Sequence, residues 1–206
     1  RGHQIDVIYQ HDIALINNTV TGFSRALTLS DTPQTNHHWY RTSDPVATPL
    51  HAFDAVLMRK DPPFDLEYVY STYLLELAES QGAWIINSPK AIRDHNEKLS
   101  IAQFPQFMTP TLVTSQPRLI REFLNEHQDI ILKPLDGMGG ASVFRVHSTD
   151  HNLSVIIETL THYGTHTIMA QRFIPEISQG DKRILLIAGQ AVPHALARIP
   201  KPGETR

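Results

Sequence analysis

The sequence predicts a chain of the α/β and α+β classes, with a parallel α/β domain followed by a mixed α+β domain. Two observations carry this prediction. Apolar strands at residues 54–58 and 84–87 flank a long helical stretch with short links, which favours a right-handed parallel β–α–β unit. After Pro110, helices alternate with strands around a glycine-rich turn, which is typical of antiparallel pairing in an α+β domain.

Composition narrows the class of protein. The 206 residues are 41% hydrophobic, enough for one or two domains with real cores. The net charge of −3 argues against nucleic acid or an anionic membrane as a partner. The absence of cysteine excludes disulfides and cysteine chemistry in this segment, and no apolar run of 18 or more residues is present. We expect a cytoplasmic protein, and the start at Arg1, without a signal-peptide pattern, suggests a chain entered midway.

Strand-like segments open the first domain. Residues 4–9 predict a strand, and residues 12–16 and 20–29 predict a hairpin whose turn is the pair Asn17–Asn18. The polar, proline-bearing stretch 30–51 predicts a loop. Its histidines have no third partner at metal-binding spacing and receive no role: His37, His38 and His51.

The strongest predicted helix follows Asp65, which is expected to cap it, and ends at Gly82. Helical spacing places one apolar stripe on the core side, tyrosines included: Leu66, Val69, Tyr70, Tyr73, Leu74, Leu77 and Ala78. Ser88–Pro89 predicts the start of a short second helix. Residues 94–99 predict another helical piece, on which Lys98 alone would be an ordinary exposed lysine.

Charged residues follow the strand at 54–58. Arg59 and Lys60 stand at its carboxyl end, where ligands usually bind in α/β units. The alternative is a solvated turn stiffened by the two prolines that follow.

The second domain is predicted as a series of short elements. After the helix come strands, a second helix and a connector that ends in proline: 117–126 (helix), 130–133, 143–146, 152–162 (helix), 167–170 and 171–175 (connector). Strands at 184–187 and 192–199 are then joined by a turn at Ala188–Gly189. Residues 200–206 are polar and predict a mobile loop.

The glycine-rich turn after Lys133 is the first candidate site. Glycines allow positive φ and a close approach of the backbone to a ligand, and amides in such a turn bind anions beside a lysine. A Walker A loop would need the lysine after the glycines, and a dinucleotide fingerprint would need glycine or alanine where Ser142 stands. A polyphosphate is the expected ligand, and an ordinary hairpin turn is the alternative.

Five motifs in order resemble those of the bacterial glutathione synthetases, a family of the ATP-grasp superfamily of carboxylate–amine ligases. They are Met-Arg-Lys-Asp-Pro-Pro-Phe-Asp (58–65), Asn-Glu-Lys-Leu (96–99), Ile-Leu-Lys-Pro-Leu-Asp-Gly-Met-Gly-Gly (131–140), Gly-Asp-Lys-Arg (180–183) and Leu-Ala-Arg-Ile-Pro with Gly-Glu-Thr-Arg (196–206). The likeness runs from about residue 54 to residue 206, and the first fifty residues match in plan only.

The resemblance implies an ATP-grasp fold with a Rossmann-like (pre-ATP-grasp) N-terminal domain. It divides the chain into the N-terminal domain (1–97), the ATP-grasp lid (98–175) and the start of the C-terminal subdomain (176–206). The implied reaction joins γ-glutamylcysteine to glycine through an acyl phosphate and converts ATP to ADP and phosphate. Members associate as homotetramers, so a homo-oligomer is expected.

Residue by residue, the resemblance also implies roles. Lys98 and Lys133 resemble the lysines that hold the α- and β-phosphates of ATP, and Asp181 resembles the acidic residue on the ribose. A flexible loop over the phosphates corresponds to Gly137, Met138, Gly139, Gly140, Ala141 and Ser142. The adenine hinge corresponds to Gln171, Arg172, Phe173 and Ile174, with the backbone of Arg172 and Ile174 reading the purine edge.

Further cations are similar to those that face transferring phosphate and substrate carboxylates: Arg183, Arg198 and Arg206. Arg183 could instead form a local salt bridge. Arg59 and Lys60 are expected on the substrate side. Mg²⁺ or Mn²⁺ is implied, but its acidic and asparagine ligands have no counterpart before Arg206 and are expected downstream, so no metal ligand is named. The alternatives are another ATP-grasp ligase and a non-catalytic nucleotide-binding module.

Overall fold

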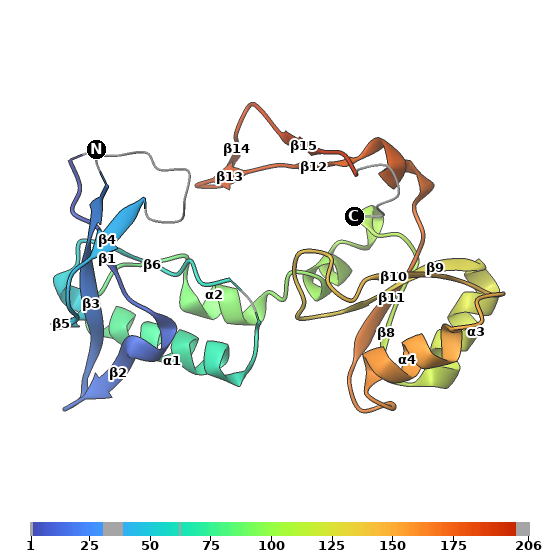
Figure 1. The fold of residues 1–206 in the computed structure, drawn as a ribbon, viewed down its shortest axis with the longest axis horizontal. Helices are drawn as coiled ribbons and strands as arrows, with labels where there is room; N and C mark the ends of the chain where they lie inside the picture. Colours follow the sequence, from blue (N-terminus) through green and yellow to red (C-terminus); the bar gives the residue numbers. More distant parts are fainter. Residues whose placement is uncertain (1, 31–38, 62, 201–206) are drawn as a thin grey trace. The chain divides into compact units, whose positions relative to one another are not determined.

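The computed structural model describes residues 2–30, 39–61 and 63–200. The chain divides into two units, Arg1–Leu99 and Ser100–Arg206, whose elements are drawn in Figure 1. The predicted three-part division at 97/98 and 175/176 stays a prediction. No helix in the described ranges has the length and apolarity that a membrane span requires.

The first unit contains a five-stranded antiparallel arrangement around the long strand β3 (Thr19–Leu29). Its partners are β1 (Asp6–Val7), β2 (Ile13–Ile16), β4 (Tyr40–Thr42) and β5 (Val46–Pro49). The predicted hairpin is confirmed, because Asn17 and Asn18 join β2 to β3 with φ of 48° and 61°, both positive as a tight hairpin turn requires.

The predicted loop at 30–51 is wrong where the structure describes it. The strands β4 and β5 lie there, and a short 3-10 turn, η2 (Leu50–Ala52), follows them. Both strands pair with β3. Backbone pairing with this long strand therefore produces strands in a segment whose polar composition predicts a loop. Another 3-10 turn, η1 (Gln10–Asp12), precedes β2.

Helix α1 (Leu66–Ser80) begins as predicted, with the backbone N–H of Tyr68 donating to Asp65 Oδ1 at 2.9 Å. Its buried face differs from the predicted stripe and comprises Tyr68, Ser71, Thr72, Leu75 and Ala78. Tyr70 and Tyr73 are each 52% exposed, so their assignment to the core was wrong.

Hydroxyl groups explain why polar residues occupy the buried face of α1. Ser71 Oγ donates to the carbonyl of Glu67 at 2.8 Å, and Thr72 Oγ1 donates to the carbonyl of Val69 at 2.7 Å. A buried hydroxyl that is bonded within its own helix carries no unpaired donor. The small side chains of Ser71 and Thr72 can therefore pack in the interior, although a search for apolar residues alone would not assign them to the core.

The predicted parallel unit is confirmed. Strand β6 (Val56–Leu57) precedes α1 in the sequence and β7 (Ile85–Ile86) follows it, and the two strands pair in parallel. Helix α2 (Pro89–Asp94) comes next. The helical piece predicted from Asp94 was wrong. Helix α2 ends there, and Asn96 Oδ1 accepts from the backbone N–H groups of Lys98 and Leu99 at 3.0 and 2.9 Å. This turn leads into η3 (Leu99–Gln103).

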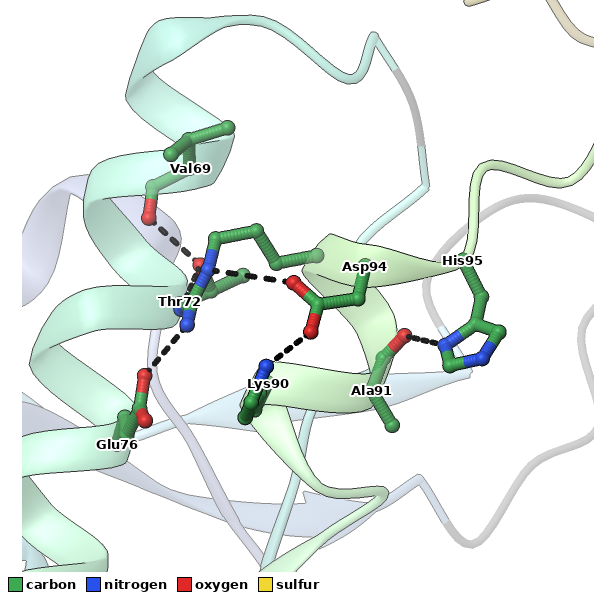
Figure 2. A network of polar contacts seen from close by, with 8 residues as sticks. Val69, Thr72, Glu76, Lys90, Ala91, Asp94 and His95 are labelled. Carbon is green, nitrogen blue, oxygen red and sulfur yellow. Dashed lines mark hydrogen bonds and ion pairs between the residues drawn. The ribbon is translucent and has the colours of Figure 1, made fainter. Parts of the chain in front are cut away.

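Ionic contacts join α1 to α2. Arg93 donates to Glu76 Oε2 at 2.7 Å and to Thr72 Oγ1 at 3.2 Å, and its guanidinium lies 4.3 Å from the ring centroid of Tyr73. Figure 2 shows Glu76 and Thr72 on α1 beside the Lys90–Asp94 pair of α2. The contact with Arg93 gives Tyr73 a partner on the surface of the unit.

The second unit is built on an antiparallel sheet of order β10-β9-β11-β8, as the α+β prediction required. Its strands are β8 (Thr111–Thr114), β9 (Asp129–Pro134), β10 (Phe144–His147) and β11 (Ile168–Arg172). Two helices accompany it, α3 (Pro117–His127) and α4 (Leu153–Thr161). Short 3-10 turns lie outside the sheet: η4 (Pro105–Phe107) and η5 (Pro175–Gln179).

One face of this sheet forms the core. Side chains from α3 and α4 pack against alternate residues of the strands, and the buried cluster comprises Ile120, Leu124, Ile130, Leu132, Val146, Ile157, Leu160, Ile168 and Ala170. Figure 1 shows the two helices together at this sheet. Because side chains alternate along a strand, the residues between these must point to the opposite face.

The last part of the chain forms two short ladders instead of two continuous strands. Strand β12 (Asp181–Arg183) pairs with β15 (Leu196–Arg198), and β13 (Leu186–Ile187) pairs with β14 (Gln190–Ala191). The predicted strands at 184–187 and 192–199 were therefore too long. Pro193 interrupts the second of them, since it has no N–H to donate to a ladder.

Candidate functional site

A row of hydrogen-bonded polar side chains crosses the sheet on the face opposite the core. Lys133 Nζ on β9 donates to Gln171 Oε1 on β11 at 2.6 Å, and Gln171 Nε2 donates to Thr111 Oγ1 on β8 at 2.9 Å. The register explains this, because Lys133 is paired with Met169, two residues before Gln171, and Gln171 is paired with Thr111. The glutamine therefore fixes the position of the ammonium group, which has three donors.

The glycine-rich turn joins β9, which ends at Pro134 next to Lys133, to β10. Gly139, Gly140 and Ser142 have φ of 64°, 75° and 58°, and the Ala141 N–H donates to the Met138 carbonyl at 3.1 Å. Nothing lies within 4 Å of where a Cβ of Gly139 would be, so its glycine is needed for conformation rather than for space. An exposed turn of this kind presents amides to an anion.

The predicted hinge begins inside β11. Arg172 still belongs to that strand, its backbone N–H donates to the Pro110 carbonyl at 3.0 Å, and the Phe173 N–H donates to the Asp129 carbonyl at 3.0 Å. A cavity of about 380 Å³ lies beside the hinge and is lined by His127, Asp129, Arg172, Phe173, Ile174, Pro175 and Glu176. The hinge backbone thus lies along an open concave surface.

Sequence reasoning missed a cluster at the same end of the sheet. Arg145 on β10 donates to both carboxylate oxygens of Asp129 at 3.0 and 2.7 Å, and its guanidinium lies 3.6 Å from the ring centroid of Phe173. The Arg145 hydrogen bonds lower the pKa of Asp129, and the same bonds raise the pKa of Arg145. The strand register sets Arg145 opposite Ile131 and His147 opposite Asp129, and no local sequence pattern indicated this pairing.

Two residues with separate predicted roles contact each other in the terminal hairpin. Arg198 donates to Asp181 through Nε at 2.7 Å and through a second nitrogen at 2.5 Å. These bonds lower the pKa of Asp181, to which the charge of Arg183 also contributes. The structure therefore pairs the predicted ribose ligand with Arg198 rather than with Arg183.

Three predicted site residues belong to the first unit. Lys98 Nζ lies 2.6 Å from Glu97 Oε1, and its side chain is only 15% exposed, unlike that of an ordinary surface lysine. Lys60 Nζ donates to the Asp61 carbonyl at 2.7 Å, and its own carbonyl accepts from the Tyr68 hydroxyl at 3.2 Å. Burial raises the pKa of Tyr68, and Asp61 adds to it. Arg59 is exposed in the same loop.

Some predictions fall on residues outside the described ranges. These are Arg206 with the loop before it, from residue 201 onward, as well as Pro62 of the first motif and two of the histidines, His37 and His38. In the part of the chain that the structure describes, no group of three or more histidine, cysteine, aspartate or glutamate residues could hold a metal ion.

Comparison with known proteins places the chain in a family. Residues 1–93 match the family model described as prokaryotic glutathione synthetase, N-terminal domain. Residues 97–206 match the model described as prokaryotic glutathione synthetase, ATP-grasp domain. The chain belongs to the prokaryotic glutathione synthetase family.

Curated relatives with the name glutathione synthetase match along the whole chain. Those from Nitrosomonas europaea, Ralstonia nicotianae and Shewanella oneidensis are 67%, 57% and 53% identical over 206 residues. The chain spans 63–64% of the length of these relatives. The resemblance seen in the motifs is therefore confirmed at the level of the family.

Solved structures support the fold. D-cycloserine synthetase DcsG superposes with a TM-score of 0.55 at 17% identity, covering 75% of this chain and 59% of that one. D-alanyl-alanine synthetase A from Vibrio cholerae superposes with a TM-score of 0.53 at 15% identity, covering 92% and 57%. Together with the family match, they confirm the predicted ATP-grasp fold. In the first unit, parallel pairing as in a Rossmann-like domain is seen between β6 and β7, whereas the five-stranded sheet is antiparallel.

Proposed function

We propose that the full-length protein is a glutathione synthetase, an ATP-dependent ligase that joins γ-glutamylcysteine to glycine and releases ADP and phosphate. The observation that carries this proposal is the ammonium group of Lys133, held by Gln171 on a sheet face immediately before an exposed glycine turn. A fixed cation beside a glycine-rich turn suits a polyphosphate. Membership of the family supplies the substrate class.

The chain offers groups for each part of ATP. Lys98 and Lys133 would hold the α- and β-phosphates, and the loop of residues 137–142 would cover them. The backbone of Arg172 and Ile174 would bind the purine edge at the hinge, within the sequence Gln171, Arg172, Phe173 and Ile174. Asp181 would accept hydrogen bonds from the ribose hydroxyls.

The Asp181–Arg198 pair does not oppose this assignment. Both side chains are well exposed, at 41% and 50%, and an exposed ion pair contributes little to stability. Exchanging it for ribose hydroxyls on Asp181 and for an anionic group on Arg198 therefore costs little. Arg183 and Arg206 would add further charge at phosphate or substrate carboxylates, with Arg59 and Lys60 on the peptide side.

The chemistry needs positioning and charge neutralisation more than a protein nucleophile. The substrate carboxylate attacks the γ-phosphorus and ADP leaves, which gives an acyl phosphate. The glycine amine then attacks the acyl carbon and phosphate leaves. A divalent metal such as Mg²⁺ or Mn²⁺ supplies charge neutralisation in this class of transfer. Among the described residues, no group of three or more histidine, cysteine, aspartate or glutamate residues could hold such an ion.

Product analysis tests the proposal. The full-length protein is incubated with γ-glutamylcysteine, glycine and MgATP, and glutathione and ADP are expected in equal amounts. Lys133→Ala is the variant expected to lose activity, and Arg118→Met, an exposed helix arginine paired with Glu122, is the matched control.

The outcomes separate the alternatives. ADP and a ligated product only with a different acid or amine would indicate another ATP-grasp ligase. ATP binding without ADP formation under any substrate pair would indicate a nucleotide-binding module and overturn the proposal. Oligomeric state is measured on the same sample, with a homotetramer expected from the family.

A further inference from the structure

Arg145 makes two different contacts at the start of the hinge. Its guanidinium donates two hydrogen bonds to the Asp129 carboxylate, and the guanidinium carbon lies over the Phe173 ring, 3.6 Å from the centroid. Phe173 is also held through its backbone, because its N–H donates to the carbonyl of Asp129 at 3.0 Å. Arg145 therefore contacts the ring of Phe173 and also Asp129, whose carbonyl accepts the hydrogen bond from the Phe173 backbone.

The register places these groups on the face that carries Lys133. Asp129, Ile131 and Lys133 alternate along β9, and Arg145 is paired with Ile131 across the β9–β10 ladder. The neighbours Ile130 and Leu132 are fully buried on the core face. The Arg145 side chain thus reaches across β9 toward β11 on the side away from the helices.

The contacts of Arg145 differ from those of an ordinary surface ion pair. Exposed pairs contribute little when both side chains are mobile. Here the side chains of Arg145 and Asp129 are 37% and 28% exposed, the carboxylate is bound by two parallel N–H groups, and the same cation stacks on an aromatic ring. Such an arrangement restricts Asp129 on β9, Arg145 on β10 and Phe173 directly after β11.

We infer that Arg145 is a positioning residue that holds Phe173, and with it the Arg172–Ile174 backbone, in the geometry that recognises the purine of ATP. This inference rests on the proposed function, because it takes the hinge to be the purine site. Lys133 binds phosphate under that proposal and is indifferent to the base. Arg145 accordingly affects base recognition, and Lys133 affects all nucleotides alike.

The test measures ATP and GTP binding to the full-length protein for wild type, Arg145→Met and Arg145→Lys. Methionine retains an apolar contact with Phe173 but removes the fork and the charge, so we expect about tenfold weaker ATP binding. GTP binding should change much less, so the preference for ATP should fall. Lysine keeps the charge without the planar fork and should recover only part of the preference.

Further variants control for a purely structural effect. Arg118→Met removes an exposed arginine of the same unit and should leave both affinities unchanged. Asp129→Asn should reproduce the loss seen in Arg145→Met, and the double variant should lose little more than either single one. The turnover number at saturating ATP should stay within about twofold of wild type, because positioning of the base acts on binding.

The results that overturn the inference are distinct from those that overturn the function. If wild type binds ATP tightly and Arg145→Met has the same ATP affinity and the same preference for ATP over GTP, the role of Arg145 is refuted. The proposed function is then unaffected. Wild type that binds no ATP refutes both. If the methionine variant does not fold, Arg145→Lys decides by the same ratio of ATP to GTP affinity.

Discussion

The two faces of the sheet β10-β9-β11-β8 are made by alternate residues of the same strands, and along β9 the two faces differ in polarity. On one face, Ile130 and Leu132 of β9 are fully buried against α3 and α4. On the other, Asp129 and Lys133 of the same strand make ionic and hydrogen-bonded contacts. A period of two residues is enough to separate the apolar from the polar role.

This difference indicates that one face of β9 contributes to stability and the other to binding. Apolar burial on the helix face supplies the folding free energy, so the other face is free to hold cations that apolar packing would not tolerate. Substitutions on the two faces should therefore change different measured quantities. The following predictions test that separation.

The largest effect is expected from Leu132→Ala on the core face. Leu132 is 0% exposed, and removing such a side chain costs about 2–5 kcal/mol of unfolding free energy. Thermal unfolding by calorimetry should show a clearly lowered Tm, whereas Val155→Ala, at a residue of α4 that is 62% exposed, should change it little. ATP affinity of the folded fraction should be close to wild type. Equal losses of stability in the two variants would contradict the assignment of the core.

The next effect is expected from Lys133→Ala on the polar face. Losing a charged hydrogen bond to phosphate should weaken ATP binding by about 1.5–3 kcal/mol. The Tm should change less than in Leu132→Ala, because the Lys133 side chain is not part of the core cluster. Lys133→Arg should not restore full affinity, since a planar fork differs from an ammonium group. Wild-type affinity in the alanine variant, by isothermal titration, would remove Lys133 from the site.

The loop between the two strands provides a third test. Gly139→Val places a β-branched side chain at φ of 64°, so the turn must change shape, and turnover should fall by about tenfold or more. Gly189→Val is a matched control, since Gly189 also has positive φ (77°) and open space at its Cβ position, but in the β13–β14 turn. Turnover that falls equally in both variants, or a large loss of Tm with normal turnover, would show that Gly139 serves structure alone.

Local patterns were sufficient for much of the fold. The hairpin at Asn17–Asn18, the cap at Asp65 and the strand that carries Lys133 were predicted because each depends on a few neighbouring residues. The strands β4 and β5 were missed because pairing with β3 creates them, and no local signal records that pairing.

The site shows the same limit. Lys133 and the glycine turn stand out in the sequence, whereas Arg145 was not recognised as important. Its partners, Asp129 and Phe173, lie 16 and 28 positions away, and only the register of three strands brings them together. The reverse error affected α1, where Tyr70 and Tyr73 fit a helical apolar stripe but the helix buries Ser71 and Thr72.

The smallest effect concerns acid stability of the polar face. The Arg145 hydrogen bonds lower the pKa of Asp129, so folding is favoured by an ionised carboxylate. Because the pKa in the folded state lies below the unfolded value of about 3.9, this contribution is present above about pH 4 and is lost as the pH falls through the folded pKa. Asp129→Asn, which cannot ionise, should lack it.

The measurement is the Tm of wild type and Asp129→Asn between neutral pH and about pH 3. The difference between them should be constant above the unfolded pKa and should shrink in acid, by a small amount, because partly exposed ion pairs contribute modestly. Arg145→Met should show the same convergence, whereas Leu132→Ala should stay below wild type at every pH. A difference between wild type and Asp129→Asn that does not change in acid would mean that the pair does not stabilise the folded state, and the polar face would then contribute to binding alone.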